Sequence, residues 1–234
     1  MLVLLAGLAG GVQYWYVSRT APYEHFLAGK EAFGRLDFEA VTSAAEYLQD
    51  KPGYEPHYHV LNGMLLLGKG RLLEAITESG HGRGHPDTCA AAHAVSGEAL
   101  YKAGHFGDAV RILGVAVELE PSETRARRLL AAAYYDIGVM YLAEEHLSIL
   151  AEQVPEDPRP HRLMGLIHKD FQKYQMAIEE YQESLRRGPD QPERDLVLLE
   201  LGECLLKERR HDEALDALGR SAPSAQVAAL EAEC

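Results

Sequence analysis

The chain of 234 residues has little of what disulfide scaffolds and nucleic-acid-binding proteins need. Its three cysteines (Cys89, Cys204 and Cys234) are odd in number and form no CxxC pair, so their spacing indicates no disulfide framework. Only 23 residues are Lys or Arg, against 36 Asp and Glu, which leaves a net charge of −13. Because nucleic-acid binding depends on neutralising phosphates with cations, this balance argues against such a partner.

Motifs of common catalytic and nucleotide-binding sites are missing as well. The sequence contains no GxSxG, HExxH, Walker-type GxxxxGK[ST] or EF-hand pattern. The run from Gly80 to His85 resembles a phosphate-binding loop only in its glycines, since it lacks both the Lys-Ser/Thr pair and a preceding strand. We therefore expect no enzymatic activity, no cofactor and no small-molecule substrate.

What the sequence does contain is a period of 34 residues. Small and special residues recur at this step: Ala75, Ala109, Ala143 and Ala177; Gly29, Gly63, Gly97 and Gly165; Pro121, Pro155 and Pro189. Three residue types in phase on one period indicate a stacked array of repeats.

One period, residues 158–191, predicts two helices joined by a short polar turn. Apolar residues recur at helical spacing over residues 159–171 and again over residues 175–186. A Gly-Pro pair then ends the second helix. Gly165 and Ala177 are expected to be small because the two helices approach each other closely at these positions.

This pattern resembles the tetratricopeptide repeat family, with Gly97, Phe106, Ala109, Pro121 and Tyr134 at its characteristic positions. The resemblance implies an all-α fold: a right-handed superhelical solenoid of about six helix-turn-helix units, preceded by an N-terminal apolar helix. We expect repeats over residues 22–55, 56–89, 90–123, 124–157, 158–191 and 195–228, with residues 229–234 as a tail.

The chain departs from the family at the early aromatic position of the first helix. Histidine stands there four times, as His25, His59, His93 and His161, and Arg127 takes the remaining place. We favour a packing role, in which the imidazole replaces a larger ring between neighbouring repeats and hydrogen-bonds a turn. The alternative is a pH-responsive array, because histidine titrates near neutrality.

The N-terminal segment is apolar. Residues 1–17 contain no charged side chain, and Tyr14, Trp15, Tyr16 and Arg19 suit a membrane interface. We interpret residues 1–20 as a single-pass membrane anchor, with the side of the membrane left open. A cleaved signal peptide and a buried or mis-started helix are the alternatives, although no basic residue precedes the apolar run.

Four metal-binding side chains recur at steps of four: His81, His85, Cys89 and His93. Zinc takes nitrogen and sulfur ligands of this kind, but Pro86 interrupts any single helix that would carry all four. We favour a loop followed by an ordinary helix start and expect no metal.

The family resemblance also implies a concave groove, lined by the first helices, that holds an extended peptide or a partner helix. It places these residues on the inner face: Tyr101, Lys102, Arg125, Arg128, Tyr135, Arg159, Arg162 and Lys169. Six are basic within an acidic chain, and arginine suits carboxylate recognition. Alternatively, these arginines pair within the chain with Glu120, Glu123, Glu156 or Asp157.

The sequence therefore favours a non-enzymatic protein-protein interaction scaffold that binds a peptide or an acidic partner surface and is tethered to a membrane. By analogy of fold, such tethered arrays are similar to bacterial envelope assembly factors. The alternative function is a histidine-based module that binds a metal or senses pH.

Overall fold

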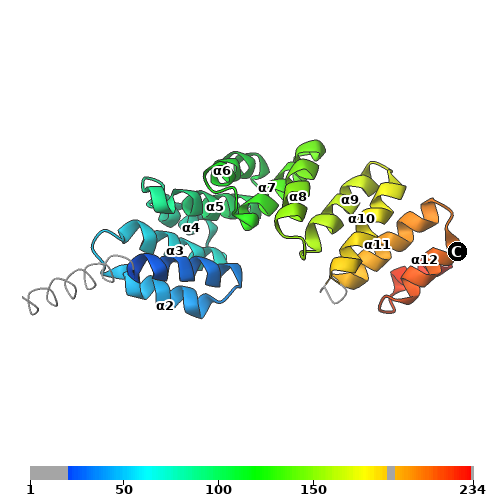
Figure 1. Ribbon diagram of the computed structural model, residues 1–234, viewed down its shortest axis with the longest axis horizontal. Coiled ribbons are helices and arrows are strands. Elements are labelled where there is room, and N and C mark those ends of the chain that lie inside the picture. The colour runs from blue at the N-terminus through cyan, green and yellow to red at the C-terminus, as the bar shows by residue number, and fades with distance from the viewer. Residues whose placement is uncertain (1–20, 189–192, 233–234) are drawn as a thin grey trace, which may run out of the picture. The chain divides into compact units, whose positions relative to one another are not determined.

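A computed structural model describes residues 21–188 and 193–232 (Figure 1). Within these ranges the chain forms helices and turns and no strand. It divides into two compact units, which meet in sequence between Leu129 and Leu130. Each unit is described below by itself.

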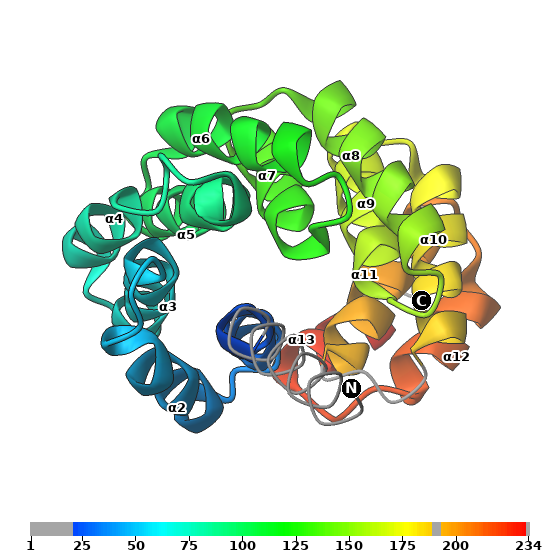
Figure 2. The same cartoon turned by 60° about the vertical axis from the view of Figure 1, so that its left-hand side comes forward.

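The first unit is a succession of helices, each packed on the next. A helix over residues 21–34 is followed by α2 (Phe38–Gln49), α3 (Glu55–Gly68), α4 (Leu72–Gly80), α5 (Pro86–Lys102) and α6 (Phe106–Leu119). Figure 2 shows these helices following one another as neighbours, and α3 also packs on α5. Helix α7 (Thr124–Asp136) begins in this unit and ends in the second.

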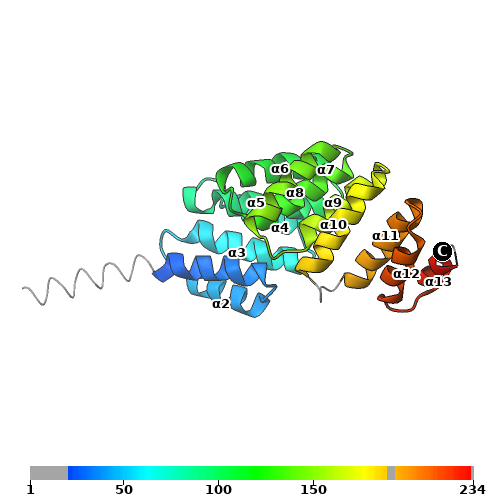
Figure 3. The ribbon, with the colours of Figure 1, turned by 45° about the vertical axis from the view of Figure 1, so that its right-hand side comes forward.

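The second unit continues the same alternation. It contains α8 (Met140–Gln153), α9 (Arg159–Asp170), α10 (Tyr174–Arg187), α11 (Arg194–Lys207), α12 (His211–Gly219) and α13 (Ala225–Glu231). Figure 3 shows the pairs α9–α10 and α11–α12 as helical hairpins, and α9 also contacts α11. The short α13, capped by the Ser224 side chain on the backbone N–H of Val227, packs against α11 and α12.

The predicted membrane anchor, residues 1–17, lies outside the described residues. Among the helices that are described, none combines the length and the apolar character needed to cross a bilayer.

Small residues lie where paired helices touch, as the sequence predicted. A Cβ atom added to Gly97 would come within 2.6 Å of Leu113 Cγ, and one added to Gly165 within 2.7 Å of Tyr181 Cε1. Ala109 and Ala177 are completely buried in the facing helices. Because the glycines carry no side chain, Leu113 and Tyr181 pack directly on the backbone of α5 and α9.

The turn within each hairpin uses a left-handed backbone, and it repeats with the period. Gly70, Gly104 and Gly138 have φ near +80°, a conformation that glycine adopts without steric cost. Leu36, Gln172 and Arg209 adopt φ between 57° and 59° at the corresponding turns. Side chains disfavour this conformation, so tertiary packing holds the turn even where the local residue opposes it.

The glycine-rich segment after α4 is a loop held by internal hydrogen bonds. The Thr88 hydroxyl donates to the Gly82 carbonyl oxygen at 2.6 Å, and the Gly82 N–H donates to the Ser79 carbonyl oxygen at 2.9 Å. A Cβ atom at Gly82 would meet Val60 Cγ2 at 2.3 Å. The glycine therefore allows this loop to lie directly against α3.

Candidate partner-binding residues

The eight residues predicted to bind a partner fall into the two units, four in each. The first unit holds Tyr101, Lys102, Arg125 and Arg128, and the second holds Tyr135, Arg159, Arg162 and Lys169. Their positions on α5, α7 and α9 agree with the predicted first helices, and Arg159 is the first residue of α9.

In the first unit, Arg125 is engaged by a buried carboxylate. Its Nε and one terminal nitrogen donate to the two oxygens of Glu98 at 2.7 and 2.8 Å, and its guanidinium lies 4.4 Å from the centre of the Phe33 ring. Lys102 also pairs with Glu98, at 3.1 Å. Burial alone would raise the pKa of Glu98, but the hydrogen bonds and charge of Arg125, aided by Lys102, outweigh burial and lower it.

Arg125 and Lys102 thus both pair with a buried carboxylate of the first unit. Tyr101 packs its ring against that of Phe106, with 5.4 Å between centroids, and Arg128 is partly buried on α7. The carboxylate that engages Arg125 is not one of those we expected at the repeat junctions, because Glu98 lies in the last part of α5.

In the second unit, three of the four residues have close partners. Arg159 forms a two-bond pair with Asp157 at 2.7 and 2.8 Å, a partner that the sequence did suggest. Lys169 pairs with Glu203 at 3.1 Å. The Tyr135 hydroxyl donates to Asp170 at 2.6 Å; burial and this hydrogen bond raise the pKa of Tyr135 to about 12.

Arg162 differs from the other paired cations. Its Nε lies 3.8 Å from Glu200 Oε2, beyond hydrogen-bond distance, and within the described residues neither atom has a hydrogen-bond partner. The buried hydroxyl of Tyr181 nearby is unpartnered in the same sense. Burial raises the pKa of Glu200, and Arg162 offsets this effect only in part. The Arg162 side chain remains 22% exposed.

Hollows of the second unit include two of the predicted residues, Lys169 and Arg159. One, of about 360 Å³, is lined by Lys169, its partner Glu203, Asp170 and Cys204, among others. Burial raises the pKa of the Cys204 thiol to about 12, so this cysteine is an inert apolar residue. The sequence analysis placed Lys169 on the inner face but did not identify Glu203 as its partner.

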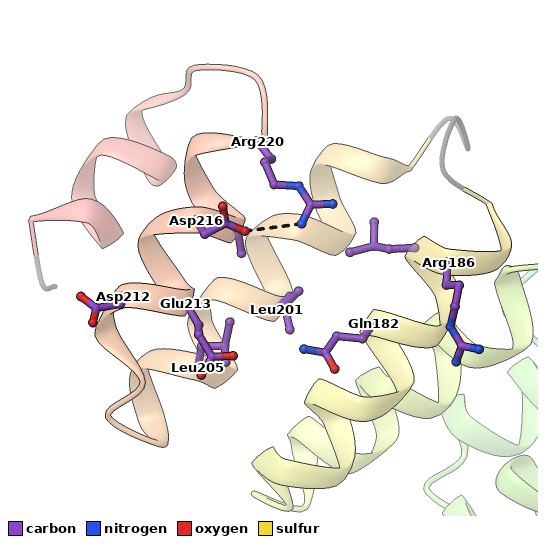
Figure 4. Close-up of a pocket in the computed structure, with 10 residues that line it drawn as sticks. Gln182, Arg186, Leu201, Leu205, Asp212, Glu213, Asp216 and Arg220 are labelled. Atoms are coloured by element: carbon purple, nitrogen blue, oxygen red, sulfur yellow. Dashed lines mark ion pairs between the residues drawn. The ribbon is translucent and has the colours of Figure 1, made fainter.

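A larger hollow, of about 460 Å³, lies on α10, α11 and α12 (Figure 4). Its floor is apolar, with Leu201 and Leu205, and its rim carries Asp212, Glu213, and Asp216, which pairs with Arg220 at 3.6 Å. None of the eight predicted residues lines it. A third hollow, of about 540 Å³, lies at the start of α9 and is lined by Arg159 and its partner Asp157, among others.

The histidine column has structural partners of several kinds. His59 pairs with Glu78 at 2.8 Å, and His161 pairs with Glu180 at 2.7 Å, three periods further along the chain. His93 bonds the backbone oxygen of Cys89 at 2.8 Å. His25 stacks on Tyr47 with 3.8 Å between ring centres, and Arg127 donates to the Pro121 carbonyl oxygen at 2.9 Å. These contacts support the packing interpretation of the column.

The four metal candidates of the sequence do not meet at one point. Cys89 and His93 are close, with 3.7 Å between Sγ and Nδ1. His81 lies against the ring of His59, and His85 against that of His57, because the loop carries both toward α3 rather than along α5. Burial, followed by the charge of His85, lowers the pKa of His57. The sequence analysis did not single out His57, since it lies outside every spacing pattern.

Comparison with known families gives one consistent result. Two family models, each described as tetratricopeptide repeat, match residues 100–167 and 162–229. Together they cover residues 100–229, which is more than half of the chain. No curated protein matches the sequence.

Solved structures share the fold at low sequence identity. PilF of Pseudomonas aeruginosa is 15% identical with a TM-score of 0.73, over 93% of this chain and 99% of PilF. A MamA protein of Desulfovibrio magneticus RS-1 is 20% identical with a TM-score of 0.64, over 77% of this chain and 97% of its own. A chain of the APC/C hetero-tetramer Cut9–Hcn1 is 18% identical with a TM-score of 0.66, over 88% of this chain and 39% of its own.

Proposed function

We propose that this chain, which carries tetratricopeptide repeats, is a non-enzymatic scaffold for protein-protein interactions. Proteins built from these repeats generally act in this way, and the matches to two family models support the assignment. Within each unit the repeated helical hairpins offer helix faces for a partner, and the sequence contains no constellation of catalytic residues.

The observation that carries the site assignment is the loose contact of Arg162 with Glu200. Four other predicted cations pair with a carboxylate at 3.1 Å or less: Lys102, Arg125, Arg159 and Lys169. Arg162 and Glu200 are 3.8 Å apart. A carboxylate held by both terminal nitrogens of an arginine normally forms two bonds of about 2.7–2.9 Å. Arg162 therefore has recognition capacity that its own neighbours do not use.

The charges around Arg162 restrict the kind of partner that can bind there. Two cations, Arg162 and Lys169, share this region with the carboxylates of Asp170, Glu200 and Glu203. A broadly acidic surface would be repelled by these three acids. We therefore propose an extended peptide that presents one carboxylate to Arg162, held by a directional contact rather than by long-range attraction.

Tethering to a membrane through residues 1–17 remains part of the proposal. It is supported by the run of uncharged residues, the aromatic cluster at its end and the following Arg19. The bacterial-type assembly role is supported only by likeness of fold to PilF and MamA.

Peptide binding tests the site directly. Pools of fluorescent peptides, matched in length and carrying one Glu, one Gln or one Lys at a fixed position, are titrated with the protein and followed by anisotropy. We expect preference for the Glu pool, lost at least tenfold, or about 1.4 kcal/mol, in Arg162→Glu. Arg162→Lys should keep part of the affinity, because it retains the charge but not the planar fork.

Arg111→Glu is the matched control, because Arg111 is an exposed arginine on α6 in the other unit. Affinity capture from membranes in mild detergent, with Arg128→Glu/Arg162→Glu beside wild type, then identifies natural partners. Equal binding of the three pools, or equal loss in the Arg111 control, would contradict the assignment of Arg162.

A further inference from the structure

His57, in the first turn of α3, is a buried histidine without hydrogen bonds. Only 1% of it is exposed, and neither ring nitrogen has a partner among residues 21–188 and 193–232. Its ring packs edge-on against Phe26, with 4.8 Å between centroids, and lies 4.9 Å from the ring of Tyr54. An imidazole that is buried with both nitrogens unsatisfied calls for a further ligand, such as a water or an ion.

Two more potential ligands lie beside this histidine. The ring of His85 is 5.0 Å from that of His57, centre to centre, and His85 Nδ1 lies 3.9 Å from Asp87 Oδ2. One nitrogen or oxygen atom from each of the three residues lies within 4.8 Å of the other two. His85 caps α5 and Asp87 stands in its first turn, so one short segment brings both groups to His57.

We propose that His57, His85 and Asp87 bind a divalent transition metal ion, with Zn²⁺ as the best match. Two imidazoles and one carboxylate are ligands that zinc accepts, and three protein ligands leave a fourth position for water or for a group from a partner. The presence of two imidazoles disfavours Mg²⁺ and Ca²⁺, which take oxygen ligands.

The geometry requires only a modest closure. Zinc–ligand distances of about 2.0–2.2 Å place tetrahedral ligand atoms about 3.3 Å apart, so the three groups must approach by about 1.5 Å at most. The side chains of His85 and Asp87 are 36% and 53% exposed and are able to rotate. His57 is fixed by packing and would be the rigid ligand.

The repeat pattern does not explain these side chains. One period further along, the positions of His57 and His85 are occupied by Ala91 and Leu119. Packing within the repeat therefore has no general need for imidazoles here. The loop that carries His85 is held in place by the bond from Thr88 to the Gly82 carbonyl oxygen.

This site lies in the first unit, whereas Arg162 lies in the second, so the inference does not rest on the proposed function. Its test uses the full chain, freed of metal with a chelator and titrated with Zn²⁺ in a calorimeter. Metal content after desalting is measured by mass spectrometry. We expect one Zn²⁺ per chain and a rise in the melting temperature on binding, as required for a ligand of the folded state.

Three variants assign the ligands. His85→Ala and Asp87→Asn change partly exposed side chains, and each is expected to weaken Zn²⁺ binding at least tenfold with unchanged helicity. His57→Gln tests the third ligand, provided that circular dichroism shows a folded chain. His81→Ala, in the same loop but outside the cluster, is the matched control and should bind like the wild type.

The proposal is overturned if the wild type binds no Zn²⁺ at one equivalent, or if His85→Ala and Asp87→Asn bind like the wild type. It is equally overturned if His81→Ala loses binding as strongly as they do, since the ion would then sit beside His59 and His81 instead. Peptide binding at Arg162 is unaffected by any of these outcomes.

Discussion

Glu98 on α5 and Glu200 on α11 are two buried glutamates, one in each unit, with opposite surroundings. Glu98 is 4% exposed and Glu200 is 8% exposed. Arg125 holds Glu98 with two bonds of 2.7 and 2.8 Å, whereas Arg162 stands 3.8 Å from Glu200. The pKa of Glu98 is lowered and that of Glu200 is raised, although burial acts on both in the same direction.

The difference shows that burial alone does not set the direction of a carboxylate's pKa shift. The hydrogen bonds and charges around the carboxylate decide it. An arginine that satisfies a buried carboxylate is a structural element, and removing it leaves a charge in the interior. An arginine that stands off from its carboxylate contributes little to the fold and remains able to bind something else. This contrast separates Arg125 from Arg162, which the sequence placed in one set.

Removing each arginine should give the largest contrast. Arg125→Ala leaves Glu98 with Lys102 alone and should lower the free energy of unfolding by about 3 kcal/mol. Arg162→Ala breaks no hydrogen bond within the described residues and should cost under about 1 kcal/mol. Urea unfolding followed by circular dichroism measures both, with exposed Arg111→Ala as the control. Equal costs for the two variants would break the comparison.

The pH dependence of stability should have opposite signs for the two glutamates. The pKa of Glu98 is lowered because the folded state favours its charged form. This contribution to stability is fully present above pH 4.5, the ordinary pKa of a glutamate, and is lost as pH falls through the folded-state pKa. Burial of Glu200 favours its protonated form in the folded state, which is why its pKa is raised. The stability of the fold therefore falls as pH rises from 4.5 through the folded-state pKa.

Glutamine variants read out these signs. Glu98→Gln should lose about 2 kcal/mol at pH 7, because hydrogen bonds to a charged group are lost, and should flatten the acid side of the stability curve. Glu200→Gln should be as stable as the wild type or more stable at pH 7. Urea unfolding from pH 3 to 8 provides the curves, and destabilisation by Glu200→Gln at pH 7 would contradict the raised pKa.

The glycines beside the two glutamates should give the smallest contrast. A Cβ atom at Gly97 would meet Leu113 Cγ at 2.6 Å and the Leu113 backbone nitrogen at 3.3 Å, whereas one at Gly202 would meet only the Leu218 side chain, at 2.7 Å. Gly97→Ala should therefore destabilise by about 1 kcal/mol after its gain in helix propensity, and Gly202→Ala by less.

Gly114→Ala is the control for this pair, because the added methyl group would meet nothing within 4 Å. It should stabilise α6 by up to about 1 kcal/mol through helix propensity. Thermal unfolding ranks the three variants. If Gly97→Ala is as stable as Gly114→Ala, the close contact between Gly97 and Leu113 does not restrict this position to glycine.

Features that repeat could be predicted, and pairings between distant residues could not. The close approaches at Gly97 and Gly165 followed from the spacing of small residues, since a fixed period maps onto one helix contact. The pairings of Arg125 with Glu98 and of Arg162 with Glu200 do not follow the period. Their members are 27 and 38 positions apart in the sequence, respectively. His57 was missed for the same reason, because its neighbours arrive on a loop.

By itself the sequence determined the all-α fold, the helical hairpins and the small residues at their contacts, because periodic burial and chain-ending residues are local properties. Only the tertiary structure decided which cations are held by carboxylates, because that depends on atomic distances between helices. It also decided that Leu36, Gln172 and Arg209 adopt the left-handed turn that glycine takes elsewhere. Packing on both sides of each turn outweighs the preference of a single residue.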